Sequence, residues 1–90
     1  MQQQGALTRA QIAFDAGEYS TALQHLDRAR TYEAQHPASF AEIDFLRARC
    51  FEATNNPATA IAAYKLLLKN YPDTPAATKA KARLAELQTK

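Results

Sequence analysis

The sequence predicts an all-α fold, and three features point to it. Apolar residues recur at helical spacing along the chain, while the alternation typical of strands is absent and the 90 residues include no valine. Alanine supplies much of the 47 % hydrophobic content, and its small side chain lets helices approach closely. The two glycines and four prolines lie near the points where helical spacing stops. A chain of this length fits one domain or a fragment of one.

The first helical hairpin is predicted from two amphipathic segments, at about residues 5–16 and 19–34. The apolar face of the first consists of Ala6, Ala10, Ala13 and Phe14. Gly17 follows it, and glycine favours the left-handed turn that ends many helices. The second segment must end before Pro37, because proline disfavours helix in the preceding residue. Its apolar face consists of Tyr19, Ala22, Leu23, Leu26 and Ala29.

The third segment, at about residues 38–54, carries two apolar stripes on different sides of one helix. One stripe consists of Ala41, Phe45, Ala48 and Phe51, and the other of Ile43, Leu46 and Cys50. A helix with two apolar stripes is packed on two sides. The single cysteine, Cys50, has no disulfide partner in the chain and is expected to be a buried structural thiol.

The last two segments, at about residues 57–71 and 75–88, each begin with a proline behind a polar residue. Asn56 before Pro57 and Thr74 before Pro75 are typical of an N-cap followed by proline at the first helical position. The expected buried face of the fourth helix consists of Ala60, Ile61, Tyr64, Leu67, Leu68 and Tyr71. In the fifth it consists of Ala77, Ala80, Leu84 and Leu87, with Lys79, Lys81, Arg83 and Glu86 on the wet side.

The chain also matches itself after a shift of 38 residues. The matched pairs are Ala10 and Ala48, Ala13 and Phe51, Gly17 and Asn55, Ala22 and Ala60, Leu23 and Ile61, Leu26 and Tyr64, and Pro37 and Pro75. Two helix-turn-helix units followed by a fifth helix account for this match.

The matched units share a pattern of small, aromatic and turn residues. In the first unit it consists of Ala10, Ala13-Phe14, Gly17-Glu18-Tyr19, Ala22-Leu23, Leu26 and Ala29, and in the second of Ala48, Phe51, Asn55, Ala60-Ile61, Tyr64 and Tyr71-Pro72. The pattern resembles the tetratricopeptide repeat. The stretch Tyr71 to Pro75, with Ala80 and Leu84 to Leu87, is similar to repeats of bacterial cell-envelope proteins, such as lipoproteins and periplasmic coordinators of outer-membrane assembly.

The resemblance implies a fragment of a right-handed α-solenoid, with two hairpins and a C-terminal capping helix in a single domain over residues 1–90. The chain departs from the family pattern at several places. The first unit is about four residues longer than the usual 34. Ala6 stands where Trp is common, and Arg9 and Arg47 stand where Leu is common. These departures weaken local packing without changing the class.

The resemblance further implies that the first helix of each hairpin and the fifth helix line a concave groove. The expected lining residues are Gln4, Leu7, Gln11, Phe14, Asp15, Glu42, Phe45, Arg49, Glu52, Lys79 and Arg83. Phe14 and Phe45 are the expected anchors, with plain core packing as the alternative for both. Some repeats of this family grip a terminal carboxylate with Lys and Asn. Here those places hold Leu7, Gln11, Phe45 and Arg49, which favours a helix or an extended segment as the ligand.

The titratable residues form no catalytic or metal-binding pattern. His25 and His36 are eleven residues apart, too far along a helix for one metal ion. Glu42, Asp44 and Glu52 share one helix, whereas general acid-base catalysis needs carboxylates opposed across a pocket, so they are expected to be solvated or to line the groove. The glycines are isolated, so a phosphate cradle is not expected. The sequence therefore predicts neither enzyme activity nor a cofactor.

Charge and hydropathy argue against two further classes. The net charge of +2 is mild for a nucleic-acid-binding domain, and no aromatic residues are interleaved among the basic C-terminal residues Lys69, Lys79, Lys81, Arg83 and Lys90. We therefore expect no nucleic-acid partner. No apolar run reaches the length of a membrane span, so we expect no membrane insertion.

Two functional hypotheses follow. The first is an interaction module that holds a protein partner's peptide or helix in the groove, as part of a larger scaffold or envelope-associated protein, with the bacterial periplasm or cell envelope favoured over the cytoplasm. The alternative is self-association, for example as a homodimer, through exposed end faces. Two repeats and a cap are near or below the roughly three that a stable stack needs, which leaves end faces that copies of the chain can pair.

Overall fold

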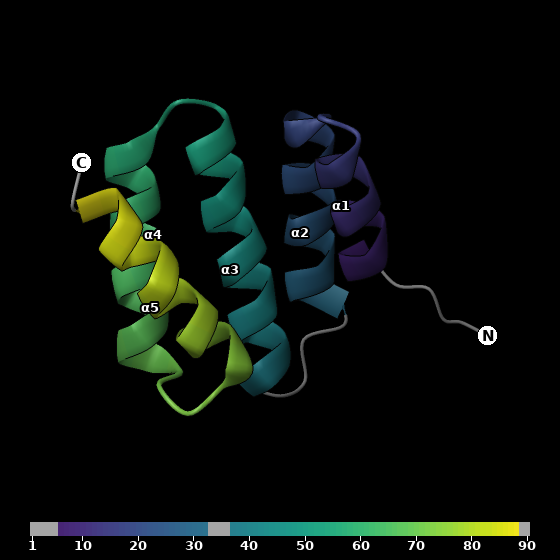
Figure 1. The fold of residues 1–90 in the computed structure, drawn as a ribbon. Coiled ribbons are helices and arrows are strands. Elements are labelled where there is room, and N and C mark those ends of the chain that lie inside the picture. Colours follow the sequence, from purple (N-terminus) through teal and green to yellow (C-terminus); the bar gives the residue numbers. More distant parts are fainter. Residues whose placement is uncertain (1–5, 33–36, 89–90) are drawn as a thin grey trace.

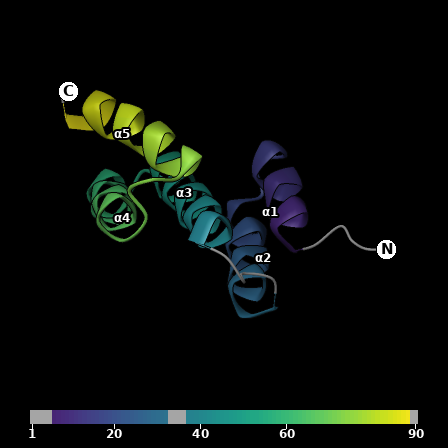
Figure 2. The same ribbon diagram turned by 90° about the horizontal axis from the view of Figure 1, so that it is seen from below.

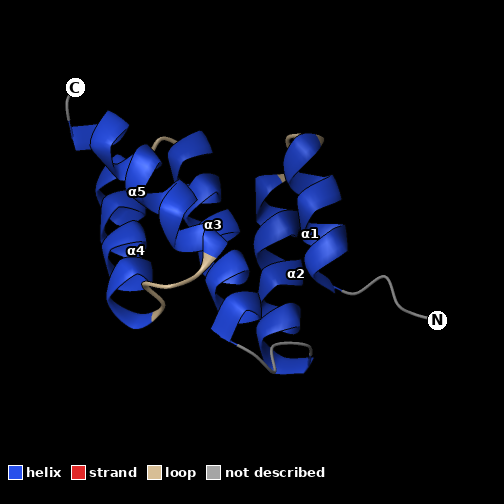
Figure 3. Ribbon diagram, turned by 60° about the horizontal axis from the view of Figure 1, so that its bottom comes forward, coloured by secondary structure: helices blue, strands red, loops and turns tan. Residues whose placement is uncertain are grey.

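The computed structural model describes residues 6–32 and 37–88, which form five helices and no strand (Figures 1 and 3). The helices are α1 (Ala6–Asp15), α2 (Tyr19–Tyr32), α3 (Pro37–Ala53), α4 (Pro57–Asn70) and α5 (Pro75–Gln88). The all-α fold class is therefore confirmed. Compared with the predicted ranges, α1, α3 and α4 end one residue earlier and α3 begins one residue earlier. Gln4, Gly5, residues 33–34, His36 and Lys90 lie outside the described residues.

The helices form two antiparallel hairpins and a fifth helix that follows them. α1 packs on α2 and α3 packs on α4, while α5 contacts both α4 and α3. Seen from below, α1, α3 and α5 lie along one side of the molecule, and α2 and α4 lie along the other (Figure 2). The first helices of successive units therefore share a face, as in other stacked helical repeats.

Helix α3 separates two hydrophobic cores. The first core consists of Ala10, Ala13, Ala22, Leu26, Ala29, Ile43, Leu46 and Cys50. The second consists of Ala41, Ala48, Ala60, Tyr64, Leu67, Ala76, Ala77 and Ala80. One predicted stripe of α3 contributes to each core, and Phe45 and Phe51 pack against the second. The prediction that α3 is packed on two sides is confirmed, and so is the burial of Cys50.

The internal repeat also holds for the backbone hydrogen bonds of the two hairpin turns. In the first hairpin the turn hydrogen bonds run from Ala16 N to Ile12 O, Gly17 N to Phe14 O, Glu18 N to Ala13 O and Ala22 N to Glu18 O. In the second they run from Thr54 N to Cys50 O, Asn55 N to Glu52 O, Asn56 N to Phe51 O and Ala60 N to Asn56 O. Each bond of the second set lies 38 residues after its counterpart. Gly17 (φ 82°) and Asn55 (φ 66°) both adopt the left-handed conformation.

The two proline-led helix starts differ in how they are capped. Thr74 behaves as predicted, because its Oγ1 accepts a hydrogen bond from the Ala77 amide at 3.2 Å. Asn56 stands at the N-cap position of α4, but its side chain makes no capping hydrogen bond. Its Nδ2 instead donates backward to Thr54 O at 3.2 Å and to Thr54 Oγ1 at 3.0 Å. The prediction of a side-chain cap at Asn56 was therefore wrong, because a local contact with Thr54 takes the amide group.

Ion pairs join the two hairpins on their polar surfaces. Arg30 on α2 contacts Asp44 on α3 at 2.5 Å, and Arg47 on α3 pairs with Asp27 on α2. Arg47 occupies a place where the repeat pattern usually has leucine, so this pair gives the departure a structural reason. Burial raises the pKa of Asp44 above its usual value, and the charge and hydrogen bond of Arg30 and the charge of Arg47 oppose that shift only in part.

Candidate functional site

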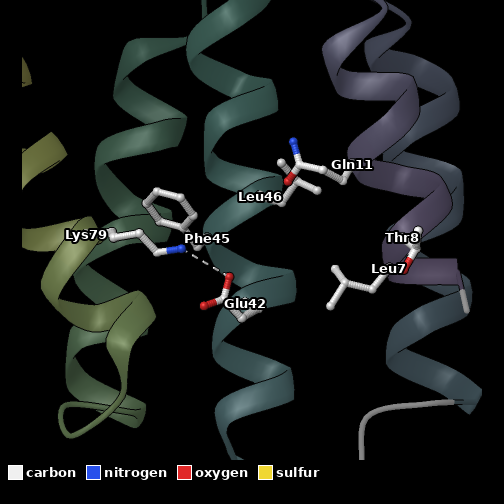
Figure 4. A pocket seen from close by; sticks show the side chains of 7 residues that line it. All are labelled: Leu7, Thr8, Gln11, Glu42, Phe45, Leu46 and Lys79. Carbon is white, nitrogen blue, oxygen red and sulfur yellow. Dashed lines mark hydrogen bonds and ion pairs between the residues drawn. The ribbon is translucent and has the colours of Figure 1, made fainter. Parts of the chain in front are cut away.

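The candidate site is a hollow on the face shared by α1, α3 and α5. Its volume is about 290 Å³, and its lining consists of Leu7, Thr8 and Gln11 from α1, Glu42, Phe45 and Leu46 from α3, and Lys79 from α5. We call it the groove hollow (Figure 4). It takes side chains from three helices because α1, α3 and α5 lie along the same side of the molecule (Figure 2).

Five of the ten described residues that were predicted to line the groove surround this hollow. They are Leu7, Gln11, Glu42, Phe45 and Lys79. The other described members are Phe14, Asp15, Arg49, Glu52 and Arg83, and they do not line it. The structure adds Thr8, and also Leu46, which sequence reasoning assigned only to the packed stripe facing the first hairpin.

One wall of the groove hollow combines charge with an aromatic ring. Lys79 Nζ lies 3.4 Å from Glu42 Oε1 and 4.9 Å from the centroid of the Phe45 ring, so it bridges α5 and α3 (Figure 4). The Lys79 and Glu42 side chains are 52 % and 37 % exposed, so water screens the pair and its stabilisation is small. Both groups therefore remain available to a ligand at little cost.

Phe45 lies between the second core and the groove hollow. Its ring packs against the second core, with its centroid 5.8 Å from that of Tyr64. The same side chain also lines the groove hollow and is only partly buried. A ring held by a core on one side and open to a groove on the other is rigid before any ligand arrives, which reduces the entropy lost on binding.

The other predicted residues except Asp15 gather in a second group, centred on Glu52. Arg83 donates two hydrogen bonds to the Glu52 carboxylate, one of them from Nε at 3.2 Å, and the Tyr64 hydroxyl donates to the same group. Arg49 Nε lies 3.9 Å from it. The Glu52 side chain is only 11 % exposed, unlike a solvated charge. We call these four residues, with Phe14, the Glu52 cluster.

The electrostatics of the Glu52 cluster favour an ionised carboxylate. Burial raises the pKa of Glu52, but the hydrogen bonds from Arg83 and Tyr64 and the charges of Arg83 and Arg49 outweigh it, so the pKa lies below its usual value. Burial, together with the hydrogen bond to Glu52, raises the pKa of Tyr64. The hydroxyl therefore stays protonated and acts as a hydrogen-bond donor. The cluster is a structural hydrogen-bond network rather than a proton-transfer site, and among the described residues Arg49 Nε is buried in it without a hydrogen-bond partner.

Phe14 and Asp15 make local contacts at the end of α1. The Phe14 ring meets the Tyr19 ring edge-on at 5.4 Å between centroids, and the Arg49 guanidinium carbon lies 5.6 Å from the Phe14 centroid. Asp15 accepts a hydrogen bond from Gln11 at 3.0 Å. Arg49 therefore links the Glu52 cluster to α1.

The role of Tyr64 in the Glu52 cluster could have been expected in part from the sequence. Tyr64 was assigned to the buried face of α4, and a buried tyrosine hydroxyl needs a hydrogen-bond partner. The pairing of Glu52 with Arg83 had no such signal, because their distance apart is set by how α5 lies on α3.

The other chemical groups give no second site. Within residues 6–32 and 37–88, no group of three or more His, Cys, Asp or Glu side chains is placed to hold a metal ion. Burial raises the pKa of the Cys50 thiol, opposed in part by the Arg47 charge, so little thiolate forms near neutral pH. None of the described helices is long and apolar enough to span a membrane.

The comparison with protein families identifies the repeat. The family model of the tetratricopeptide repeat matches residues 7–75, which is more than half of the chain and covers both hairpins except for Ala6. This confirms the resemblance drawn from the sequence. No curated protein and no solved structure matches the chain.

Proposed function

This chain belongs to the tetratricopeptide repeat family, and we propose that it binds a peptide or helix of a protein partner in the groove hollow. Repeats of this family are in general protein–protein interaction modules and are not catalytic. The observation that carries the proposal is the hollow itself, because its apolar and charged side chains come from three separate helices.

The lining supports a ligand with one apolar side chain and polar flanks. Leu7 and Phe45 are partly buried and offer apolar surface at the hollow. Gln11 at one side can donate or accept a hydrogen bond, and the half-exposed Glu42 and Lys79 offer one charge of each sign at the other. An extended segment or a helix that inserts an aliphatic or aromatic residue between these groups fits this arrangement.

The proposal places this module in a larger scaffold or envelope-associated protein. Its support is the similarity of the stretch Tyr71 to Pro75 to repeats of cell-envelope proteins. Fractionation of the source cells, followed by antibody detection of the chain, tests this part. Recovery only in the cytoplasmic fraction would reject the association with the envelope.

The binding proposal is tested with a ligand selected from a displayed peptide library and measured by fluorescence anisotropy. We expect Leu7→Asp, and separately Phe45→Ala, to weaken binding by about tenfold or more, since groove anchors carry most of the affinity. The matched control is Leu66→Asp, because Leu66 is 56 % exposed on α4 and does not line the hollow. Its affinity should equal that of the wild type.

Thermal melts accompany each variant, since Phe45 also packs on the second core. Leu7 packs against the first core as well, so for both variants a loss of binding counts only where the melt is unchanged. Binding that survives both groove substitutions and is lost in the Leu66 variant would move the site to another face and reject the proposal.

A further inference from the structure

The outer side of the first hairpin carries an exposed apolar side chain beside a second hollow. Ile12 on α1 is 63 % exposed, more than any other large hydrophobic residue that the structure describes. The hollow, of about 350 Å³, has an apolar lining of Ile12, Ala13 and Ala16 and polar edges that include Arg9 and Glu18. It shares no residue with the groove hollow.

The internal repeat shows that this position is a packing position. Ile12 matches Cys50 under the shift of 38 residues, and the two carbonyls accept equivalent turn hydrogen bonds from Ala16 and Thr54. Cys50 is fully buried in the first core, which α1, α2 and α3 form together. Within the described residues α1 contacts only α2 and α3, so nothing covers Ile12 in the same way.

The remaining surfaces of the chain indicate which occupant fits. A second copy cannot cover Ile12 with the apolar stripe of its α2 or α4, because both stripes are already buried within each copy. In α2 the stripe consists of Ala22, Leu26 and Ala29, and in α4 of Ala60, Tyr64 and Leu67. Leu66 is the other exposed large hydrophobic in the described part of the chain, and it lies among the charged side chains of Arg30, Asp44 and Arg47. At the other end of the stack, the hollow lined by Leu68, Pro72 and Ala77 has a volume of about 110 Å³, against about 350 Å³ beside Ile12. A head-to-tail contact therefore offers Ile12 a smaller hollow than a second Ile12 face does.

Two residues of opposite charge lie on either side of Ile12 on this face. Arg9 lies before Ile12 along α1 and Glu18 lies after it, at the turn into α2. Neither side chain has an ion-pair partner within residues 6–32 and 37–88. A two-fold axis at Ile12 interchanges the two ends of the face, so each arginine meets the glutamate of the other copy.

From this geometry we propose that two copies of the chain form a symmetric dimer through the outer face of the first hairpin. Each Ile12 enters the hollow of the other copy, and Arg9 of each copy pairs with Glu18 of the other. The interface is separate from the proposed peptide site, so the two proposals stand or fall independently.

Sedimentation equilibrium of the full 90-residue chain over a wide concentration range tests the dimer. We expect the dimer fraction to rise with concentration, and Ile12→Asp to raise the dissociation constant about tenfold or more, because it places a charge at the centre of the interface. Leu66→Asp is the matched control and should dimerise as the wild type does. Circular dichroism checks that both variants keep their helices.

A charge exchange tests the two-fold pairing itself. Arg9→Glu and Glu18→Arg should each weaken the dimer, and the double variant should restore it, because both ion pairs re-form with the charges reversed. A wild type that stays monomeric at every concentration overturns the proposal. So does an Ile12→Asp variant that dimerises normally, or a double variant that fails to recover.

Discussion

Arg83 on α5 holds the carboxylate of Glu52 on α3, although the two residues are 31 positions apart in the sequence. The guanidinium contacts both carboxylate oxygens, which is the geometry in which an arginine and a carboxylate bind most strongly. Tyr64 on α4 donates to the same group. Glu52 therefore connects three helices and helps to set how α5 lies on the second hairpin.

Replacing Glu52 with alanine should destabilise the protein. The change leaves Arg83 and the buried Tyr64 hydroxyl without their shared acceptor, at a cost of about 1–3 kcal/mol in the free energy of unfolding. Urea denaturation followed by circular dichroism measures it. Glu86→Ala is the control, because Glu86 also contacts Arg83, at 2.6 Å, but is 62 % exposed and should contribute less than about 1 kcal/mol. Equal losses of unfolding free energy in the two variants would show that Glu52 contributes no more to stability than Glu86 does.

The lowered pKa of Glu52 should appear in the acid dependence of stability. Its carboxyl group has a pKa below the unfolded value of about 4.3, so the stabilisation is complete above that pH and is lost as the pH falls through the folded pKa. Glu52→Gln should therefore show a shallower loss of stability between neutral and acidic pH than the wild type. Urea denaturation at a series of pH values measures the slope.

Asp44 should act in the opposite direction. Burial raises its folded pKa above the unfolded value of about 3.9, so ionised Asp44 costs stability, and that cost disappears as the pH falls through the folded pKa. Asp44→Asn should therefore make the acid loss steeper, whereas Glu52→Gln makes it shallower. If both substitutions change the slope in the same direction, one of the two assignments is wrong.

The helices and their buried faces could be predicted from the sequence because periodicity records which side of a helix avoids water. The two stripes of α3 are the clearest case, since Cys50 and Ala48 are two residues apart and lie in different cores. Gly17 likewise marked its turn, because few other residues adopt a positive φ without strain.

Contacts between helices could not be predicted in this way. The pairing of Arg30 with Asp44, or of Arg83 with Glu52, depends on how far each helix is rotated and shifted against its neighbour. For the same reason, the residues expected to line one groove lie in two separate places. Leu7 came to lie at the groove hollow, whereas Phe14, two turns further along α1, came to lie beside Arg49.

Enlarging Ala60 should disturb the contact between α3 and α4. Ala60 is fully buried in the second core and matches Ala22, which is fully buried in the first. Ala60→Leu overpacks this contact and should lower the free energy of unfolding by about 1–3 kcal/mol. Ala62→Leu is the control, because Ala62 lies on the exposed face of the same helix. A thermal melt of Ala60→Leu that coincides with that of Ala62→Leu would contradict the tight helix contact.

The left-handed turns offer a last test of the internal repeat. Gly17 has φ 82°, and a Cβ atom placed there meets nothing within 4 Å, so a substitution costs only backbone strain. Gly17→Ala should lower the free energy of unfolding by about 1–2 kcal/mol. Gly17→Asn should cost less, because the matched residue Asn55 adopts φ 66° with the same turn hydrogen bonds, and asparagine tolerates this conformation better than alanine. Chemical denaturation of the two variants gives the comparison, and an asparagine variant as unstable as the alanine variant would mean that the two turns are not equivalent.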